Sequence, residues 1–129
     1  MARVMAVALD VMMRPWEWGK ADCCTSACSV LDTLHGVDPM HAFRGTYHDV
    51  RSAQRIIHSF GGFEAMVRTL ALQHGLVPTL PVPGAVGVVT DRLGQSGLGI
   101  CAQPGVWLAK TRHGMTTLPD AREMYRVAL

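Results

Sequence analysis

Apolar positions in the first part of the chain recur at the spacing of an α-helix. Between residues 3 and 13 they fall three and four positions apart, which predicts an amphipathic helix that Pro15 ends. The same spacing returns after Asp22, a residue type that caps helix starts, and stops at Gly36, which favours a helix end. We therefore expect a second helix over residues 23–35, central and buried.

Two shorter helices are predicted in the middle of the chain. Apolar residues at helical spacing mark residues 50–60 and residues 63–70, with Gly61-Gly62 between them. The preceding Arg44-Gly45-Thr46-Tyr47 is typical of an ordered loop with one glycine at positive φ. Three prolines at residues 78–83 predict an extended linker, because proline cannot continue a helix.

Beyond Gly84 short apolar runs alternate with turn residues. We predict a strand over each of five runs, at residues 85–90, 98–102, 106–110, 115–118 and, as a closing strand, 126–129. Helices first and an antiparallel sheet second define an α+β fold. The chain has 129 residues and no internal repeat, so we expect residues 1–129 to form a single domain.

Composition and charge narrow the classes of function. A hydrophobic fraction of 49% excludes a disordered chain, and eight methionines favour an adaptable apolar interface. The net charge of +2, with the charges interspersed, provides no basic stripe for nucleic acid. The apolar N-terminal segment is too short for a membrane span, and no signal-peptide cleavage site follows it. We expect a chain made in a reducing cytosol.

The four cysteines do not have the spacing of a disulfide framework or a zinc site. Cys24 and Cys28 lie one helical turn apart, which suits packing better than bridging. No CxxC pair or nearby histidine completes a zinc ligand set. We therefore expect free thiols, with Cys101 on a strand near the helix cysteines, and no metal or cofactor. Convergence of Cys23 and the other three on zinc or an iron–sulfur cluster is the alternative.

Cys23 is the candidate catalytic residue. It follows an aromatic-glycine turn and starts a helix, and the N-terminus of a helix stabilises a thiolate. The alternative is that Cys23, Cys24 and Cys28 are small buried apolar residues, as free cysteines commonly are. Three tryptophans are candidates either for lining a groove or for core packing: Trp16, Trp18 and Trp107.

Several motifs occur in the order in which one enzyme family has them. Trp18-Gly19-x-x-Asp22-Cys23 opens a helix, Pro83-Gly84 opens a strand, and Ser96-Gly97-Leu98-Gly99-Ile100 and Gly105-Val106-Trp107-Leu108-Ala109 follow. From about residue 16 to residue 118 this order resembles the NlpC/P60 cell-wall peptidases, which are papain-like cysteine hydrolases that cut peptidoglycan stem peptides. The resemblance implies a papain-like fold with a helical insert and Cys23 at the position of the nucleophile.

The wider pattern is similar to a phage and prophage branch of this superfamily. Leu34-His35-Gly36-Val37-Asp38-Pro39, the Arg44 to Tyr47 loop, the Gly61-Gly62 pair and Leu98-Gly99-Ile100-Cys101 resemble short proteins encoded among siphophage tail-tip genes. This resemblance implies a virion protein of the phage tail tip, made in the host cytoplasm. Its implied partners are the tail hub and neighbouring tail-tip proteins, with peptidoglycan as a further candidate.

Two catalytic positions of the peptidases are changed in this chain. Where the family has His-Val-Gly-Ile, with its His as general base, this chain has Gly97-Leu98-Gly99-Ile100, and the residue that orients the imidazole falls near Ala109. His113, in the β half, is the candidate substitute base, and His48 is a further one. The other four histidines are expected to be solvated or to cap helix ends.

Loss of a general base lowers acyl-transfer rates by about 10²- to 10⁴-fold. The changed positions therefore favour a structural tail-tip component built on a degenerate peptidase fold, without hydrolase activity. The alternative is an active cysteine peptidase or amidase that cleaves peptidoglycan as phage DNA enters the cell. A remnant that binds glycan is a third possibility.

Overall fold

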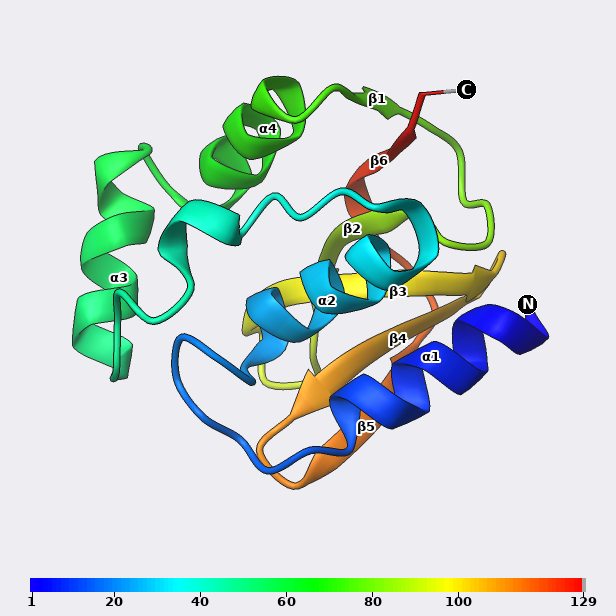
Figure 1. Cartoon of the computed structure of the whole chain (residues 1–129), viewed down its shortest axis with the longest axis horizontal. Coiled ribbons are helices and arrows are strands. Elements are labelled where there is room, and N and C mark those ends of the chain that lie inside the picture. Colours follow the sequence, from blue (N-terminus) through cyan, green and yellow to red (C-terminus); the bar gives the residue numbers. More distant parts are fainter. Residues whose placement is uncertain (129) are drawn as a thin grey trace.

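The computed structural model describes residues 1–128. In this part of the chain, four α-helices come before the six strands of an antiparallel sheet (Figure 1). The helices are α1 (Ala2–Met12), α2 (Cys23–His35), α3 (Val50–Ser59) and α4 (Phe63–Gln73), with the short 3₁₀ helix η1 (His41–Phe43) after α2. The strands are β1 (Leu76–Pro78), β2 (Val86–Thr90), β3 (Ser96–Gln103), β4 (Val106–Thr111), β5 (Gly114–Leu118) and β6 (Arg122–Val127). The predicted α+β class is confirmed.

Helix α2 begins and ends where its capping residues predict. Asp22 Oδ1 accepts a hydrogen bond from the Thr25 N–H at 2.9 Å, and Thr25 Oγ1 accepts one from the Asp22 N–H at 2.9 Å. This reciprocal capping box satisfies donors that the first turn leaves free. Gly36 ends the helix with a φ of 74°, in the left-handed region. The Asp22 cap fixes Cys23 as the first residue of α2.

The sheet has the strand order β1-β6-β2-β3-β4-β5, with every neighbouring pair antiparallel. Buried residues of α1, α2 and α4 pack on one face and form the main core. Figure 1 shows α2 lying across β3 and β4, with α3 farther from the sheet. A smaller cluster around Trp107 covers the other face. An added Cβ at Gly87 would lie 3.1 Å from the Trp107 ring, so this glycine lets the indole lie close to the sheet.

Three sequence predictions differ from the structure. Strand β1 lies where the proline linker was expected to start, and Pro78 is tolerated there because β1 is an edge strand. Strand β6 begins at Arg122, four residues before the predicted closing strand, whose last residue lies outside the described residues. The placement of Cys101 near Cys24 and Cys28 is wrong, because Cys101 belongs to the cluster around Trp107 on the opposite face.

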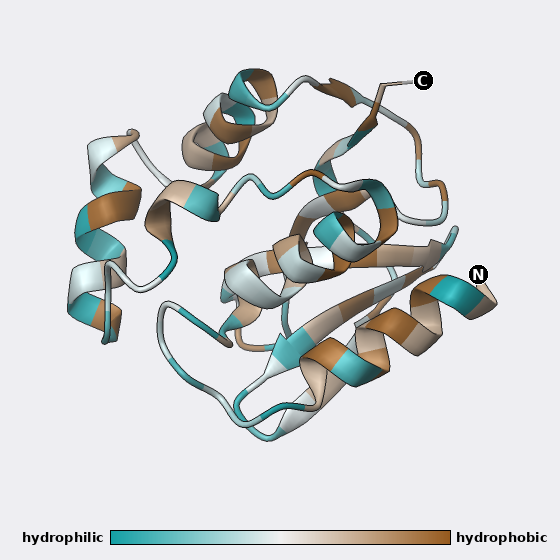
Figure 2. Cartoon of the chain, in the orientation of Figure 1, coloured by the Kyte–Doolittle hydropathy of each residue, from teal (hydrophilic) through white to brown (hydrophobic). Residues whose placement is uncertain are grey.

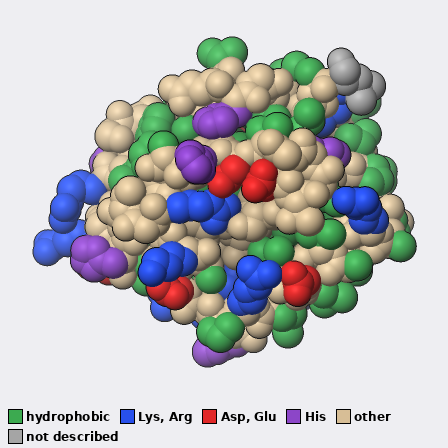
Figure 3. Space-filling view, in the orientation of Figure 1, with side chains coloured by type: hydrophobic (Ala, Val, Ile, Leu, Met, Phe, Trp, Pro, Cys, Tyr) green, Lys and Arg blue, Asp and Glu red, His purple; other side chains and the backbone are tan. Residues whose placement is uncertain are grey.

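The surface shows no concentration of charge on the face drawn in Figure 3, where basic and acidic side chains are interspersed. Within residues 1–128, no helix has the length and apolar character needed to cross a membrane.

Candidate functional site

A groove of about 700 Å³ runs between the helical insert and the sheet, and Cys23 lies in it. One wall consists of apolar side chains of α3 and α4. The opposite wall consists of the ends of β3 and β4 and the turn between β4 and β5. The hydropathy colouring of Figure 2 shows apolar and hydrophilic residues alternating around α3. Its Ala53, Ile56 and Ile57 line the groove, and none of the ten α3 residues is fully buried. Cys23 is therefore reached through a largely apolar space.

The carboxylate of Asp22 holds the segments around Cys23 together. Its Oδ1 accepts from the backbone and hydroxyl of Thr25, at 2.9 Å and 3.1 Å. Its Oδ2 accepts from the Gly19 N–H at 2.8 Å and from the Tyr47 hydroxyl at 2.6 Å. Burial, followed by the charge of Asp22, raises the pKa of Tyr47, so the hydroxyl remains a donor. Asp22 is thus a structural residue with four donors on two oxygens.

Gly19 and the loop at residues 44–47 are in direct contact. Gly19 has a φ of 80°, and an added Cβ would lie 2.3 Å from the Tyr47 carbonyl oxygen, so only glycine fits. The Gly45 N–H donates to the Gly19 carbonyl at 2.9 Å. Arg44 fastens the loop to α2, because its guanidinium donates to the Thr25 carbonyl at 3.0 Å and pairs with Asp38 at 2.7 Å. The contact between Gly19 and the 44–47 loop explains why the sequence has glycine at both residue 19 and residue 45.

The Cys23 sulfur is partly buried and has a neighbouring thiol. The Sγ atoms of Cys23 and Cys24 lie 3.9 Å apart, within reach of a weak S–H hydrogen bond. The Cys24 thiol lowers the pKa of Cys23, and the backbone N–H groups of Leu98 and Cys24 act in the same direction against burial and Asp22. The pKa of Cys24 is raised well above its ordinary value by the same pairing and by burial. Of the two thiols, Cys23 is therefore the one that loses its proton first.

Gly97, which the resemblance aligns with the family's general base, lies against Cys23. A Cβ added at Gly97 would lie 3.1 Å from the Cys23 Sγ and 3.5 Å from its Cβ. Contacts of 3.1 Å are tighter than Cβ atoms normally make, so the sulfur lies where a side chain would need room. Ala109, on the neighbouring strand β4, lines the same groove and is 5% exposed. Neither position supplies a base.

The two candidate bases, His113 and His48, are placed differently with respect to the groove that contains Cys23. His113 lines the groove from the exposed β4–β5 turn. His48 is exposed and lies 3.7 Å from the carboxylate of its neighbour Asp49. His74 caps α4, with its Nδ1 2.9 Å from the Leu70 carbonyl, as expected of a helix-end histidine. Among the described hydrogen bonds, the Cys23 sulfur is joined to the Cys24 thiol and to no imidazole.

The tryptophans divide between groove and core. Trp16 and Trp18 line the groove and meet edge to face, with ring centroids 5.2 Å apart. The guanidinium of Arg112 lies over both rings, 4.9 Å and 5.1 Å from their centroids. Lys110 fixes the segment that carries Trp16, since its buried amine donates to the carbonyls of Met12, at 2.8 Å, and Arg14. The sequence alone did not connect Arg112 with the tryptophans.

A metal does not fit the donors next to Cys23. Ligand atoms of Asp22, Cys23 and Cys24 lie within 4.8 Å of one another. The Asp22 oxygens, however, already accept four hydrogen bonds, which occupy the lone pairs that a metal would need. All four cysteines are free thiols, and Cys101 faces the other side of the sheet. The four sulfurs therefore do not converge.

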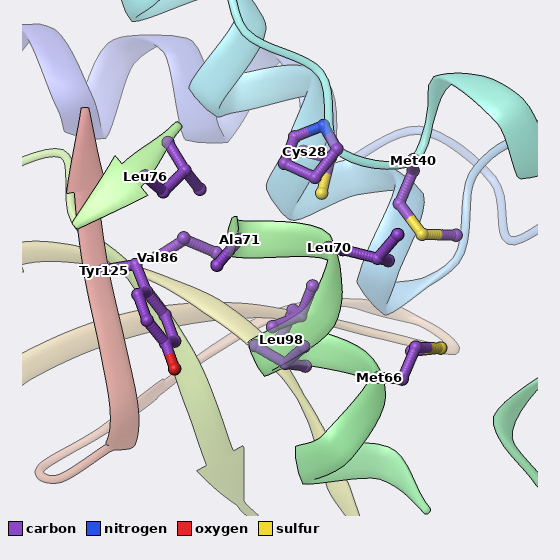
Figure 4. A pocket seen from close by; sticks show the side chains of 11 residues that line it. Cys28, Met40, Met66, Leu70, Ala71, Leu76, Val86, Leu98 and Tyr125 are labelled. Atoms are coloured by element: carbon purple, nitrogen blue, oxygen red, sulfur yellow. The ribbon is translucent and has the colours of Figure 1, made fainter. Parts of the chain in front are cut away.

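A second space, of about 20 Å³, lies inside the core. It is much smaller than the groove and has an apolar lining. Figure 4 shows that apolar side chains of α2, α4 and the sheet surround it, with Cys28 among them. Burial raises the pKa of Cys28, which therefore stays a neutral thiol. This space is a packing gap with room for about one water and no charged group to bind a ligand.

Comparison with known proteins assigns the chain to a family. Residues 1–127 match the model of a domain of unknown function, DUF6950, and the chain belongs to that family. No curated protein and no solved structure matches it significantly.

Proposed function

We propose that this chain is a structural component of a siphophage-type tail tip, built on a degenerate NlpC/P60 peptidase fold and without hydrolase activity. The family resemblance of its motifs supports the phage setting. Support for the degenerate peptidase comes from the geometry: a cysteine starts the central helix, and the strand aligned with the family's His strand runs directly past its sulfur.

The contact between Gly97 and Cys23 carries the proposal. A cysteine hydrolase needs an imidazole within hydrogen-bond reach of sulfur, to form the thiolate and to protonate the departing amine. Gly97 has no side chain, and the Cys23 Sγ lies only 3.1 Å from the point where a Cβ would be. Ala109 provides no group to orient an imidazole. Amide hydrolysis would thus lack both its base and its acid.

The open groove favours a role in binding over a closed, inert remnant. Helix α3 has a well-defined start, capped by Asp49. Its apolar side, however, is only partly covered by the rest of the chain. An incompletely covered apolar wall is typical of an interface. The proposed partners are the tail hub and adjacent tip proteins, with peptidoglycan as a further candidate.

The second candidate function is an active peptidoglycan peptidase that uses His113. Its support is that His113 lines the same groove as Cys23. Against it, His113 is exposed to solvent, and no hydrogen bond among the described residues joins its ring to the Cys23 sulfur.

Digestion of purified murein separates the two functions. We expect wild-type protein and Cys23→Ala to release equal, background amounts of stem peptide. Activity that is abolished by Cys23→Ala and by His113→Ala, but kept by His48→Ala, would establish the peptidase and refute the structural proposal. Copurification with tail tips is the positive test, and normal virions that lack the protein would count against it.

A further inference from the structure

The chemistry left at Cys23 suits one type of leaving group. An amide must have its nitrogen protonated as the bond to carbon breaks, and no imidazole is hydrogen-bonded to Cys23 among the described residues. A thiolate leaves without prior protonation, and exchange is faster when the leaving thiol has a low pKa. Thioesters can therefore react at a cysteine that has lost its general acid and base.

The sulfur itself is equipped as a nucleophile. Cys23 is the first residue of a 13-residue helix, and the Cys24 thiol lies 3.9 Å from it. Both features favour its thiolate, and Cys23 is partly exposed in the groove while Cys24 is buried.

The groove has the size and lining to hold an acyl chain. Its volume of about 700 Å³ is within the range of about 300–1,000 Å³ typical of small-molecule sites. Ile56 and Ile57 of α3, with Phe63 and Met66 of α4, form an apolar wall on the way to Cys23. A hydrocarbon chain would be covered there without leaving backbone polar groups unpaired.

A cation lies in the same groove. Arg112 is held over Trp16 and Trp18, and among the described residues its guanidinium takes part in no ion pair. A guanidinium binds phosphate or carboxylate through two parallel donors. The groove thus offers an apolar wall, the Cys23 thiol and an anion-binding group.

We propose that Cys23 accepts an acyl group from the thioester of an anionic carrier, with the acyl chain against α3 and the carrier's anionic group on Arg112. The Cys23 thiol gives its proton to solvent, and the thiolate attacks the carbonyl carbon. A new carbon–sulfur bond forms as the bond to the carrier sulfur breaks, and the released thiolate takes a proton from water. No oxidation or reduction occurs. This inference goes beyond the structural role and does not depend on it.

Intact-mass spectrometry of the purified full chain with palmitoyl-coenzyme A tests the proposal. We expect one palmitoyl group, removable by neutral hydroxylamine, on wild type and on Cys101→Ala, and none on Cys23→Ala. The folded chain should react at least about tenfold faster than the urea-unfolded chain, because only folding provides the groove and the lowered thiol pKa.

Two matched variants test the groove. Ile57→Asp should slow palmitoyl transfer about tenfold, since a charge replaces an apolar contact, while acetyl transfer changes little. His58→Asp puts the same charge outside the groove lining on α3 and should behave as wild type. Arg112→Ala should slow transfer from coenzyme A but not from the uncharged N-acetylcysteamine thioester.

Three results would overturn the inference. They are labelling of Cys23→Ala to the wild-type level, equal rates for folded and unfolded chain, and equal slowing by the two α3 variants. Protection of Cys23 by tail-tip proteins, without acylation by any thioester, would assign the groove to a protein partner instead. Acylation and murein digestion are measured separately, so failure of one does not imply failure of the other.

Discussion

The Tyr47 hydroxyl is expected to stabilise the start of α2, and Tyr47→Phe removes it while keeping the ring. Tyr47 Oη donates to the buried Asp22 Oδ2 at 2.6 Å, and the Gly19 N–H is the other described donor to that oxygen. A hydrogen bond to a charged group contributes about 1.5–3 kcal/mol. Because Phe leaves a buried carboxylate oxygen with one donor in place of two, we expect a loss of about 2 kcal/mol in the free energy of unfolding.

Urea unfolding followed by circular dichroism measures this loss. With an m value of about 2 kcal/mol/M, the midpoint should fall by about 1 M. Tyr125→Phe is the matched control, since its hydroxyl donates to Glu123 Oε2 at the same 2.6 Å. Glu123 retains its pair with Arg68 near the surface, so the control should lose less than about 1 kcal/mol.

The comparison between Tyr47→Phe and Tyr125→Phe tests whether the hydrogen bond to Asp22 is strong because Asp22 is buried. A loss below about 0.5 kcal/mol for Tyr47→Phe would show that water replaces the hydroxyl, so that Asp22 is not sealed in the core. Equal losses for the two variants would show that burial of the acceptor does not matter. Either result would refute the structural role given to Asp22.

Two further predictions concern ionisation. Arg68 and Tyr125 lower the pKa of Glu123 in the folded state, so its contribution to stability is present above about pH 4.5 and is lost as pH falls below that value. Glu123→Gln should therefore weaken the acid dependence of the urea midpoint between about pH 5 and pH 3, and an unchanged slope would contradict this. The Cys24 thiol lowers the pKa of Cys23, so Cys24→Ala should move the pH midpoint of Cys23 alkylation by iodoacetamide upward, as measured by peptide mass spectrometry. A midpoint that stays in place would assign the shift to the backbone instead.

Local signals in the sequence were sufficient for the helices. Asp22 and Gly36 bound α2 because capping depends on residues a few positions apart. Strand β1 could not be predicted in this way, since three residues ending in Pro78 carry no pattern of their own and are ordered by pairing with β6. The early start of β6 has the same cause, because Arg122 and Glu123 are not typical strand residues.

The site was predictable where it depends on chain order and unpredictable where it depends on distant contacts. The position of Gly97 beside Cys23 followed from the resemblance in motif order. The bond from Tyr47 to Asp22 joins residues 25 positions apart, and nothing in either local pattern indicates the other. The stacking of Arg112 on Trp16 and Trp18 brings together two segments about 95 residues apart in the chain. Only the folded sheet places them side by side, so the spacing of residues in the sequence could not predict it.

The place of β6 in the sheet has a consequence for synthesis on the ribosome. Strands β1 and β2 both pair with β6, the latest of the described strands to be made. Until β6 emerges, β1 has no described partner in the sheet, and one edge of β2 is open to pairing with other chains. The helices and the β2–β5 meander can form early. Strand β1 can be joined to β2 only after β6, which lies between them, has been made. Nascent chains stalled before β6 should therefore be the most prone to aggregate.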